Sequence, residues 1–330
     1  MNGGSILVDN FKNNPRSRST TLKREPAKVA AEEKSLGLFL PGGGALGAWQ
    51  LGFVKELQAA GTKIERILAF SAGGLTAAGY ALNWLEECEN QWLNSGKTKV
   101  LRIRPSVRKR AIFCNSAIHE MLNHLEDDDL CRQRLSCPIT IATVCRLSKK
   151  YLFHQFSPGG QWDGPLRPTL VGSCSIPWLF PSVKTSYRGQ DHLINDGGIG
   201  AREPFVLQGL QDCDQILILQ NAKPEGTDRT SFNRNRYSRV MNAVHFRAEE
   251  GLSTLKPRIE GREIINLYPS KPLDYHFLDF RRKNIETGIY QGIYDAQTFL
   301  EGGRLAQDKI LLEESVIHNL SSSEMAKNRT

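Results

Sequence analysis

One serine stands out as a possible nucleophile, because it lies among very small residues where an apolar run ends. Ser71 follows Phe70 and is flanked on its other side by Ala72 and Gly73. A nucleophile elbow needs such neighbours, since the sharp turn that presents its hydroxyl leaves no room for bulky side chains. The usual pattern is G-x-S-x-G, and here Ala69 occupies the first position and Gly73 the last. The alternative is an ordinary strand-to-helix turn in which Ser71 caps the helix.

A glycine-rich loop precedes this serine by one predicted helix. The run Pro41–Gly47 lies between a predicted strand and a predicted helix, and Gly42, Gly43 and Gly44 form its first half. Glycines there let the chain turn tightly and expose backbone N–H groups at a helix N-terminus, where negative charge is favoured. The loop could therefore bind an oxyanion or a phosphate.

The same loop also fits a nucleotide-binding pattern in part. The spacing of Gly42, Gly44 and Gly47 matches the dinucleotide fingerprint G-x-G-x-x-G. That fingerprint requires an acidic residue at the end of the second strand, where it holds a ribose hydroxyl. Glu65 stands instead at the start of that strand, so the glycine spacing is weak evidence by itself.

A candidate base follows a later apolar run. Asp196 is followed by Gly197 and Gly198, and a serine nucleophile needs a base beside it. An unperturbed aspartate has a pKa of about 3.9 and is a weak base near neutrality, so we expect an apolar setting that raises the pKa of Asp196. The alternative is a plain turn, because Asp-Gly pairs are common in turns.

Taken together, the three segments resemble the patatin-like phospholipase family, which combines a glycine-rich oxyanion loop, a serine elbow one helix later and a downstream Asp-Gly-Gly motif. The segment Gly172–Val183, with small residues followed by a Pro…Phe-Pro element, is also similar to the family. The stretch from Gly197 to Pro204 fits the family as well. The resemblance is clear over residues 36–220 and looser beyond them.

The resemblance implies an α/β protein with a three-layer patatin-like fold, in which helices flank a mostly parallel central sheet. It also implies a serine esterase of the phospholipase A or lysophospholipase type, acting on phospholipid or another acyl-ester lipid without a cofactor. Carried over by position, Ser71 would be the nucleophile and Asp196 the general base of a catalytic dyad. The glycine loop, with Gly42, Gly43 and Gly44, would offer backbone N–H groups to the oxyanion.

Two positions depart from the family pattern. Ala69 replaces the first glycine of the elbow, and alanine does not adopt a positive φ cheaply. Leu46 stands where many members carry a basic residue beside the oxyanion loop. Neither change removes a reacting group, but both bear on the rate and on the preferred substrate.

Two other functions stay open on the sequence. A Ser-His-Asp esterase of the α/β-hydrolase fold could use His245 or His276, although Ser71 follows only the second predicted strand, which is early for that fold. A non-catalytic patatin-like module could bind lipid or nucleotide without turnover. We expect no metal site, because the seven cysteines form no C-x-x-C pair, and His119 and His124 are five residues apart and would leave a helix on different sides.

The elements that must position these residues alternate between strands and helices. Apolar runs predict strands at 36–40, 64–70, 139–144, 151–156, 193–195, 215–219 and 263–268. Helical spacing predicts helices over 45–60, 72–92, 166–175, 237–255 and 283–300. Such alternation favours a largely parallel sheet covered on both faces. We expect one domain over residues 36–305, with a flexible basic tail at 1–35 and a C-terminal helix or tail at 306–330.

The net charge and the length of the apolar runs limit the possible partners of the protein. The 330 residues carry a net charge of +8, and the basic segment from Lys97 to Arg110 contains no acidic residue. No apolar run approaches the roughly 20 residues of a membrane span, and no secretory signal is visible. We therefore expect a cytoplasmic or peripheral membrane protein, with the basic segment either touching anionic lipid or forming a solvated face. Nucleic acid is not expected, whereas export without a cleaved signal and the oligomeric state are left open.

Overall fold

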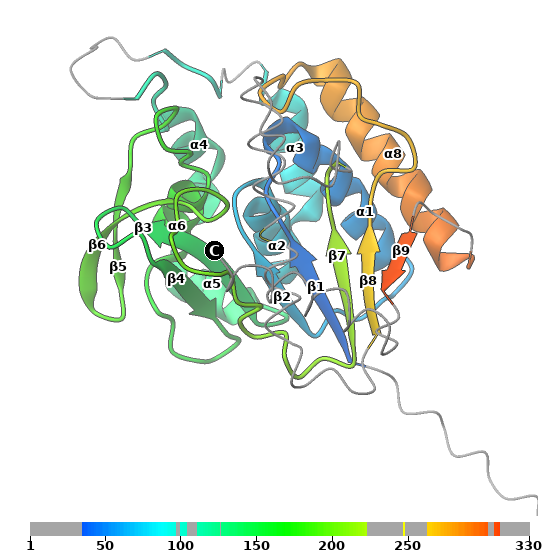
Figure 1. The fold of residues 1–330 in the computed structure, drawn as a ribbon, viewed down its shortest axis with the longest axis horizontal. Coiled ribbons are helices and arrows are strands. Elements are labelled where there is room, and N and C mark those ends of the chain that lie inside the picture. The colour runs from blue at the N-terminus through cyan, green and yellow to red at the C-terminus, as the bar shows by residue number, and fades with distance from the viewer. Residues whose placement is uncertain are drawn as a thin grey trace, which may run out of the picture. The chain divides into compact units, whose positions relative to one another are not determined.

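Apolar runs from distant parts of the sequence pair side by side into one sheet (Figure 1). The chain is represented by a computed structural model that describes residues 35–96, 100–103, 111–125, 127–222, 247 and 263–302, together with the backbone of 307–310. Its strands are β1 (Leu36–Leu40), β2 (Arg66–Ala69), β3 (Ile139–Cys145), β4 (Tyr151–Phe156), β5 (Val183–Tyr187), β6 (Gln190–Asp196), β7 (Gln215–Leu219), β8 (Glu263–Leu267) and β9 (Gln307–Ile310).

The middle of this sheet is parallel and its outer strands are antiparallel. The order is β5-β6-β3-β2-β1-β7-β8-β9, and β4 also pairs with β3. The five adjacent strands β3, β2, β1, β7 and β8 run parallel to one another. The strands β4, β5, β6 and β9 pair antiparallel. A central sheet with helices packed against it confirms the α/β class.

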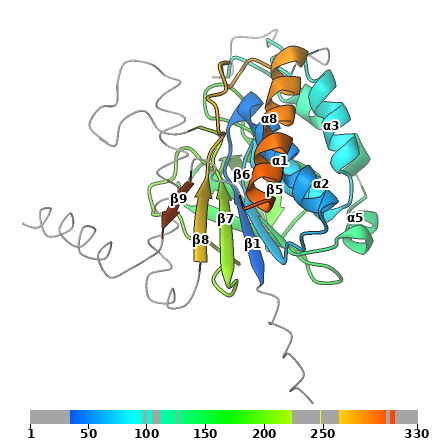
Figure 2. The ribbon, with the colours of Figure 1, turned by 90° about the vertical axis from the view of Figure 1, so that its right-hand side faces the viewer.

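The helices of the described residues pack on one face of the sheet (Figure 2). They are α1 (Gly47–Ala59), α2 (Ala72–Ala81), α3 (Leu85–Asn94), α4 (Ser116–Met121), α5 (Asp128–Arg134), α6 (Leu166–Ser173) and α8 (Arg282–Leu300), with short 3-10 helices η1 (Gly44–Leu46) and η2 (Asn123–Leu125). Every one of these α-helices contributes to the apolar cluster on that face. The opposite face buries a second cluster around the stacked rings of Phe39 and Phe205.

The single helix predicted over 72–92 is wrong, because the structure has two helices there. Asn83 lies at φ +57°, a left-handed conformation that asparagine tolerates better than most residues. The N–H of Trp84 donates to the oxygen of Gly79 and the N–H of Asn83 to that of Tyr80. This pair of bonds is a Schellman motif, which ends α2 and lets α3 start in a new direction.

Some elements of the structure were not predicted, and some predicted elements lie outside the described residues. The strands β5 and β9 and the short helices α4 and α5 were not predicted. The strand β9 pairs with β8, so the sheet includes residues beyond 305, the predicted end of the domain. The helix expected over 237–255 lies outside the described residues except for Arg247, and the basic tail at 1–35 lies outside them except for Ser35. Within the described part of the chain, no helix is both long and apolar enough to span a bilayer.

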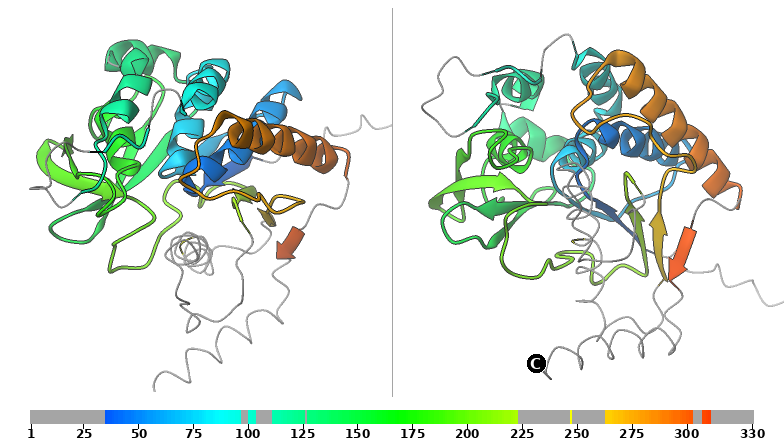
Figure 3. Two further views of the ribbon diagram at one scale, coloured as in Figure 1. Left: turned by 90° about the horizontal axis from the view of Figure 1, so that it is seen from above. Right: turned by 45° about the horizontal axis from the view of Figure 1, so that its top comes forward.

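The long helix α8 crosses directly over α1 (Figure 3). A Cβ atom placed on Gly52 of α1 would overlap the backbone oxygen of Ile289, and one on Gly292 of α8 would overlap that of Trp49. The two backbones therefore touch, which only glycine allows at these positions. Beside this crossing, the indole Nε1–H of Trp49 donates to the buried carboxylate of Asp295 at 2.8 Å. Because α1 follows the glycine loop at 41–47, this contact links that loop to α8.

Candidate active site

Ser71 and Asp196 meet because two strands point toward each other along one edge of β3. The strand β2 runs parallel to β3 and ends opposite Ile141. The strand β6 runs antiparallel and ends with Asp196 opposite Thr143. Along a strand, the backbone groups of residues an even number apart face the same edge. The oxygen of Pro138 accepts a backbone bond from β2, and the N–H of Arg146, eight residues later, donates one to β6. Both strands therefore pair with the same edge of β3. Ser71 therefore emerges from β2 where β6 stops.

Ser71 sits on a strained turn between β2 and α2. Its φ of 54° and ψ of −134° lie in a region that residues other than glycine rarely adopt. The turn is braced from α6: the Ser71 N–H donates to the hydroxyl of Ser173 at 2.9 Å, and that hydroxyl donates to the oxygen of Ala142 at 2.9 Å. Ser173 was not identified from the sequence, because only the fold brings α6 to the elbow.

The structure explains which positions of the elbow must be glycine. Ala69 ends β2 and is not among the described residues with positive φ, so alanine in place of the first glycine imposes no backbone strain. A Cβ atom on Gly73 would overlap the backbone oxygen of Leu40. The glycine that follows the serine is therefore needed for α2 to pack against β1, and Ser71 itself bears the strained conformation.

The Asp196 carboxylate is buried and faces Ser71. Its side chain accepts a hydrogen bond of 2.8 Å from the N–H of Gly198, and the nearby Ser71 hydroxyl also favours its ionised form. Burial nevertheless dominates and raises the pKa of Asp196 to about 6, while the Ser71 hydroxyl and the Gly198 N–H oppose that rise. A carboxylate with such a pKa is ionised near neutral pH and is a stronger base than an exposed aspartate.

The two glycines after Asp196 are fixed by close packing as well as by the turn. A Cβ atom on Gly197 would overlap the backbone oxygen of Ala142. One on Gly198 would lie 2.8 Å from the ring of Phe70 and 3.2 Å from the Asp196 carboxylate. The Asp-Gly-Gly motif thus lets β6 end against the elbow without displacing it.

The glycine loop lies directly beside the serine. A Cβ atom on Gly42 would lie 2.5 Å from the Cβ and 3.1 Å from the hydroxyl oxygen of Ser71. Gly44 adopts φ +55° under the backbone oxygen of Phe277. Gly47 faces the Ala72 methyl, from which a Cβ would be only 2.7 Å away. Its role is close packing of α1 on the elbow.

Some amides of this loop are used and others are not. The N–H of Ala45 donates to the oxygen of Phe277 at 2.7 Å, and that of Leu46 to Gly43 at 3.2 Å. Among the described residues, the amides at 42–44 donate to no protein acceptor. These free donors beside the serine hydroxyl are the groups that an oxyanion hole requires.

Two residues outside the predicted set hold the loop in place. The side-chain amide of Asn221, two residues after β7, donates to the oxygen of Gly42 at 3.2 Å. The side-chain amide of Gln50 donates to the oxygen of Pro41 at 2.7 Å and to that of Leu219 at 2.6 Å. Their only sequence signal is a polar amide beside buried apolar runs, which says nothing about the partner.

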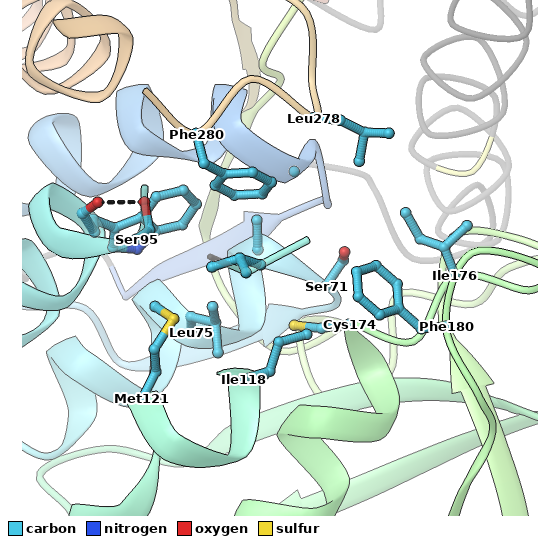
Figure 4. Close-up of a pocket in the computed structure, with 14 residues that line it drawn as sticks. Ser71, Leu75, Ser95, Ile118, Met121, Cys174, Ile176, Phe180, Leu278 and Phe280 are labelled. Carbon is cyan, nitrogen blue, oxygen red and sulfur yellow. Dashed lines mark hydrogen bonds between the residues drawn. The ribbon is translucent and has the colours of Figure 1, made fainter. Parts of the chain in front are cut away.

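An apolar pocket of about 540 Å³, part of it open to solvent, starts at Ser71 (Figure 4). Its walls come from α2, α3, α4, the segment after α6 and the loop before α8. They include Leu75, Ile118, Met121, Phe180, Leu278 and Phe280. Such a lining suits a hydrocarbon chain, and it includes residues beyond the clear part of the family resemblance.

The histidines do not complete a triad in the described part of the chain. Among the described residues, no histidine forms a hydrogen bond with Ser71 or Asp196, whose partners are Ser173 and Gly198. His276 is exposed and accepts from the N–H of Leu278 at 3.2 Å, and His245 lies outside the described residues. No group of His, Cys, Asp and Glu there could hold a metal ion.

The basic segment from Lys97 to Arg110 is described only at 100–103. Within that stretch, the guanidinium of Arg102 forms two hydrogen bonds of 2.7 Å with the carboxylate of Glu120. This pair holds the stretch against α4, beside the pocket.

Comparisons with known proteins agree with this geometry at the level of the family. The family model described as patatin-like phospholipase matches residues 38–207, just over half of the chain. A search of curated proteins finds no match. A crystal structure of VipD from Legionella pneumophila is among the similar solved structures, with 14% sequence identity and a TM-score of 0.40, covering 82% of this chain and 67% of that one.

Proposed function

This chain belongs to the patatin-like phospholipase family, and from that premise we propose that it hydrolyses acyl esters of lipids with Ser71 and Asp196 as its catalytic dyad. The observation that supports the proposal best is the buried Asp196 carboxylate, whose pKa the neighbouring Ser71 hydroxyl lowers, beside a strained serine at the mouth of an apolar pocket. Ordinary turn-forming residues need neither burial nor this partner.

The proposed reaction has two steps. The Ser71 hydroxyl oxygen attacks the ester carbonyl while Asp196 takes its proton, and the amides at 42–44 stabilise the oxyanion. The tetrahedral intermediate collapses to an acyl-enzyme, and Asp196 gives the proton to the departing alcohol. Water then attacks the acyl-enzyme with Asp196 again as base, which releases the fatty acid and restores Ser71.

The apolar lining of the pocket suits the acyl chain of the substrate. Apolar side chains from α2, α4 and the loop before α8 surround the space that leads from the Ser71 hydroxyl. A chain of a phospholipid or lysophospholipid placed there would bring its ester carbonyl to the serine and the free amides. The departures at Ala69 and Leu46 do not disturb this arrangement, since Ala69 is extended and Leu46 is buried in the core.

The positive charge supports a lipid surface as partner. The chain carries a net charge of +8, and its segment from Lys97 to Arg110 has seven basic residues and no acidic one. We propose that the protein contacts anionic membranes peripherally. Each Lys or Arg near such a surface contributes about 1 kcal/mol, an attraction that salt weakens.

The decisive experiment is a lipid-hydrolysis panel combined with a fluorophosphonate probe. Wild-type protein should react with the probe and release fatty acid, whereas Ser71→Ala should do neither. Ser136→Ala, which changes an exposed serine bonded to the backbone of Ala81, is the control and should behave as wild type. Labelling that persists in Ser71→Ala would contradict the nucleophile. Folded wild-type protein that neither reacts nor hydrolyses any lipid would indicate a non-catalytic module.

A further inference from the structure

Three exposed large apolar side chains lie on neighbouring segments of the chain. Trp178 is 73% exposed, Ile103 77% and Ile112 52%. The N–H of Ile112 donates to the backbone oxygen of Trp178 at 3.2 Å, and Ile103 forms an antiparallel bridge with Phe113. We call Ile103, Ile112 and Trp178 the apolar rim. Backbone bonds therefore hold the segments that carry these three residues next to one another.

The apolar rim borders the candidate active site. Trp178 lies between Ile176 and Phe180 in the sequence, and both of these line the pocket beside Ser71 (Figure 4). The ring centroids of Phe113 and Phe180 are 5.7 Å apart. The backbone N–H of Phe113 donates to the backbone oxygen of Leu179 at 2.8 Å. The segments that carry the rim therefore also carry residues that line the pocket beside the nucleophile.

Trp178 is held outward although its neighbours turn inward. It adopts φ +69°, a conformation that bulky residues rarely occupy, while Ile176 and Phe180 on either side are buried. Soluble proteins usually expose large apolar side chains singly, and a cluster of them next to a ligand pocket marks an interaction surface.

We propose that the apolar rim inserts into the interfacial layer of a phospholipid bilayer and so brings the pocket mouth to its substrate, an inference that rests on the proposed acyl-hydrolase function. Three side chains are far fewer than the roughly 20–30 residues that each side of a stable protein interface uses. Tryptophan is enriched where bilayers meet water. The net charge of +8 complements an anionic lipid surface.

The binding test uses Ser71→Ala protein, so that vesicles are not hydrolysed during the measurement. Sedimentation with phosphatidylcholine vesicles, with and without phosphatidylglycerol, gives the partition coefficient. Adding Trp178→Ala and Ile112→Ala should lower this coefficient at least about tenfold, since burying large apolar side chains contributes that much or more. The matched control changes Tyr290 and Tyr294 of α8, which are 70% and 61% exposed, to alanine, and should bind as the parent does.

The activity test compares two substrates with the Ser71 enzyme intact. The Trp178→Ala, Ile112→Ala variant should lose about tenfold on vesicle lipid, in proportion to its lost binding. Its hydrolysis of a soluble short-chain ester should stay within about twofold of wild type. An unchanged melting temperature shows that the variant is folded, as expected for exposed side chains.

Several results would overturn the inference. They are wild-type protein that does not bind vesicles, a rim variant that binds as well as its parent, and an equal loss of activity on both substrates. A rim variant that converts a dimer to monomers in light scattering would show that a second copy covers the patch. If wild-type protein binds vesicles through the rim but hydrolyses no ester, the acyl-hydrolase proposal fails and the membrane contact stands.

Discussion

At the scale of single residues, Asp196 joins catalysis to stability. Burial raises the pKa of this carboxyl from its usual value near 3.8 to about 6. The proposed mechanism uses the ionised form, so activity should rise with pH through about 6 and then level off. Stability has the opposite pH dependence. Between about pH 4 and pH 6 the folded protein binds more protons than the unfolded chain, so the contribution of Asp196 to stability falls as pH rises. Above about 6 the buried charge is a cost.

Replacing Asp196 with asparagine should therefore have two opposite effects. Ester hydrolysis should fall by at least about 100-fold, since the general base is lost. The free energy of unfolding at pH 7 should rise by on the order of 1–3 kcal/mol, because a shift of one pKa unit corresponds to about 1.4 kcal/mol. That gain should disappear near pH 4, where the native carboxyl is already neutral. Hydrolysis rates and urea titrations at both pH values measure the two effects.

The control for this variant lies on the same strand. Asp191 of β6 is exposed and pairs with Lys184 at 2.6 Å, so Asp191→Asn should change neither activity nor stability by more than about 0.5 kcal/mol. Turnover like that of wild type in Asp196→Asn would remove Asp196 from the mechanism. A pH profile of wild-type activity with its acidic limb near 4 would show that the essential carboxyl is not the buried one.

At the scale of elements, the strand–loop–helix units were predictable because their signals are local. The apolar run before Gly42 and the small residues around Ser71 mark β1 and β2 and the helices that follow them. The pairing of Asp196 with Thr143 was not predictable, because nothing in the sequence says which edge of β3 receives β6. The resemblance to a family supplied the dyad that local patterns left as three unrelated turns.

Neighbouring glycines in α2 should respond differently to the same substitution. A Cβ atom on Gly73 would overlap the backbone oxygen of Leu40, which cannot move without shifting β1. A Cβ atom on Gly74 would lie 3.5 Å from the side chain of Leu170, an ordinary van der Waals distance. Gly73→Ala should therefore destabilise the protein by at least about 1–3 kcal/mol, as overpacking does. It should also displace the elbow and reduce probe labelling of Ser71.

Gly74→Ala serves as the matched test for that prediction. Alanine has the higher helix propensity, so this variant should be as stable as wild type or more stable by up to about 1 kcal/mol. Thermal unfolding and fluorophosphonate labelling of both variants distinguish packing at position 73 from a general need for flexible residues in the elbow. Similar losses in the two variants would contradict the packing explanation.

At the scale of the whole molecule, the candidate site is completed by parts of the chain far from its motifs. The family model ends at residue 207, yet Asn221 holds the glycine loop and Phe277 accepts from Ala45. Leu278 and Phe280, just before α8, close one side of the pocket. The motifs supply the reacting groups, and the C-terminal segments fix the loop and shape the acyl pocket, so the site should unfold together with α8.

Substitution of the buried Asp295 tests whether the site unfolds together with α8. It accepts from the indole of Trp49 in α1 at 2.8 Å and from the N–H of Ser270 at 3.0 Å. Asp295→Ala should lower the free energy of unfolding by about 1–3 kcal/mol or more, because a buried donor loses its acceptor. Glu286→Ala, which removes an exposed pair with Arg282 on the same helix, should cost less than about 0.5 kcal/mol. In urea, helix content and esterase activity should disappear in one transition for both variants. Activity lost at lower urea concentration than helix content would mean that the site unfolds separately from α8.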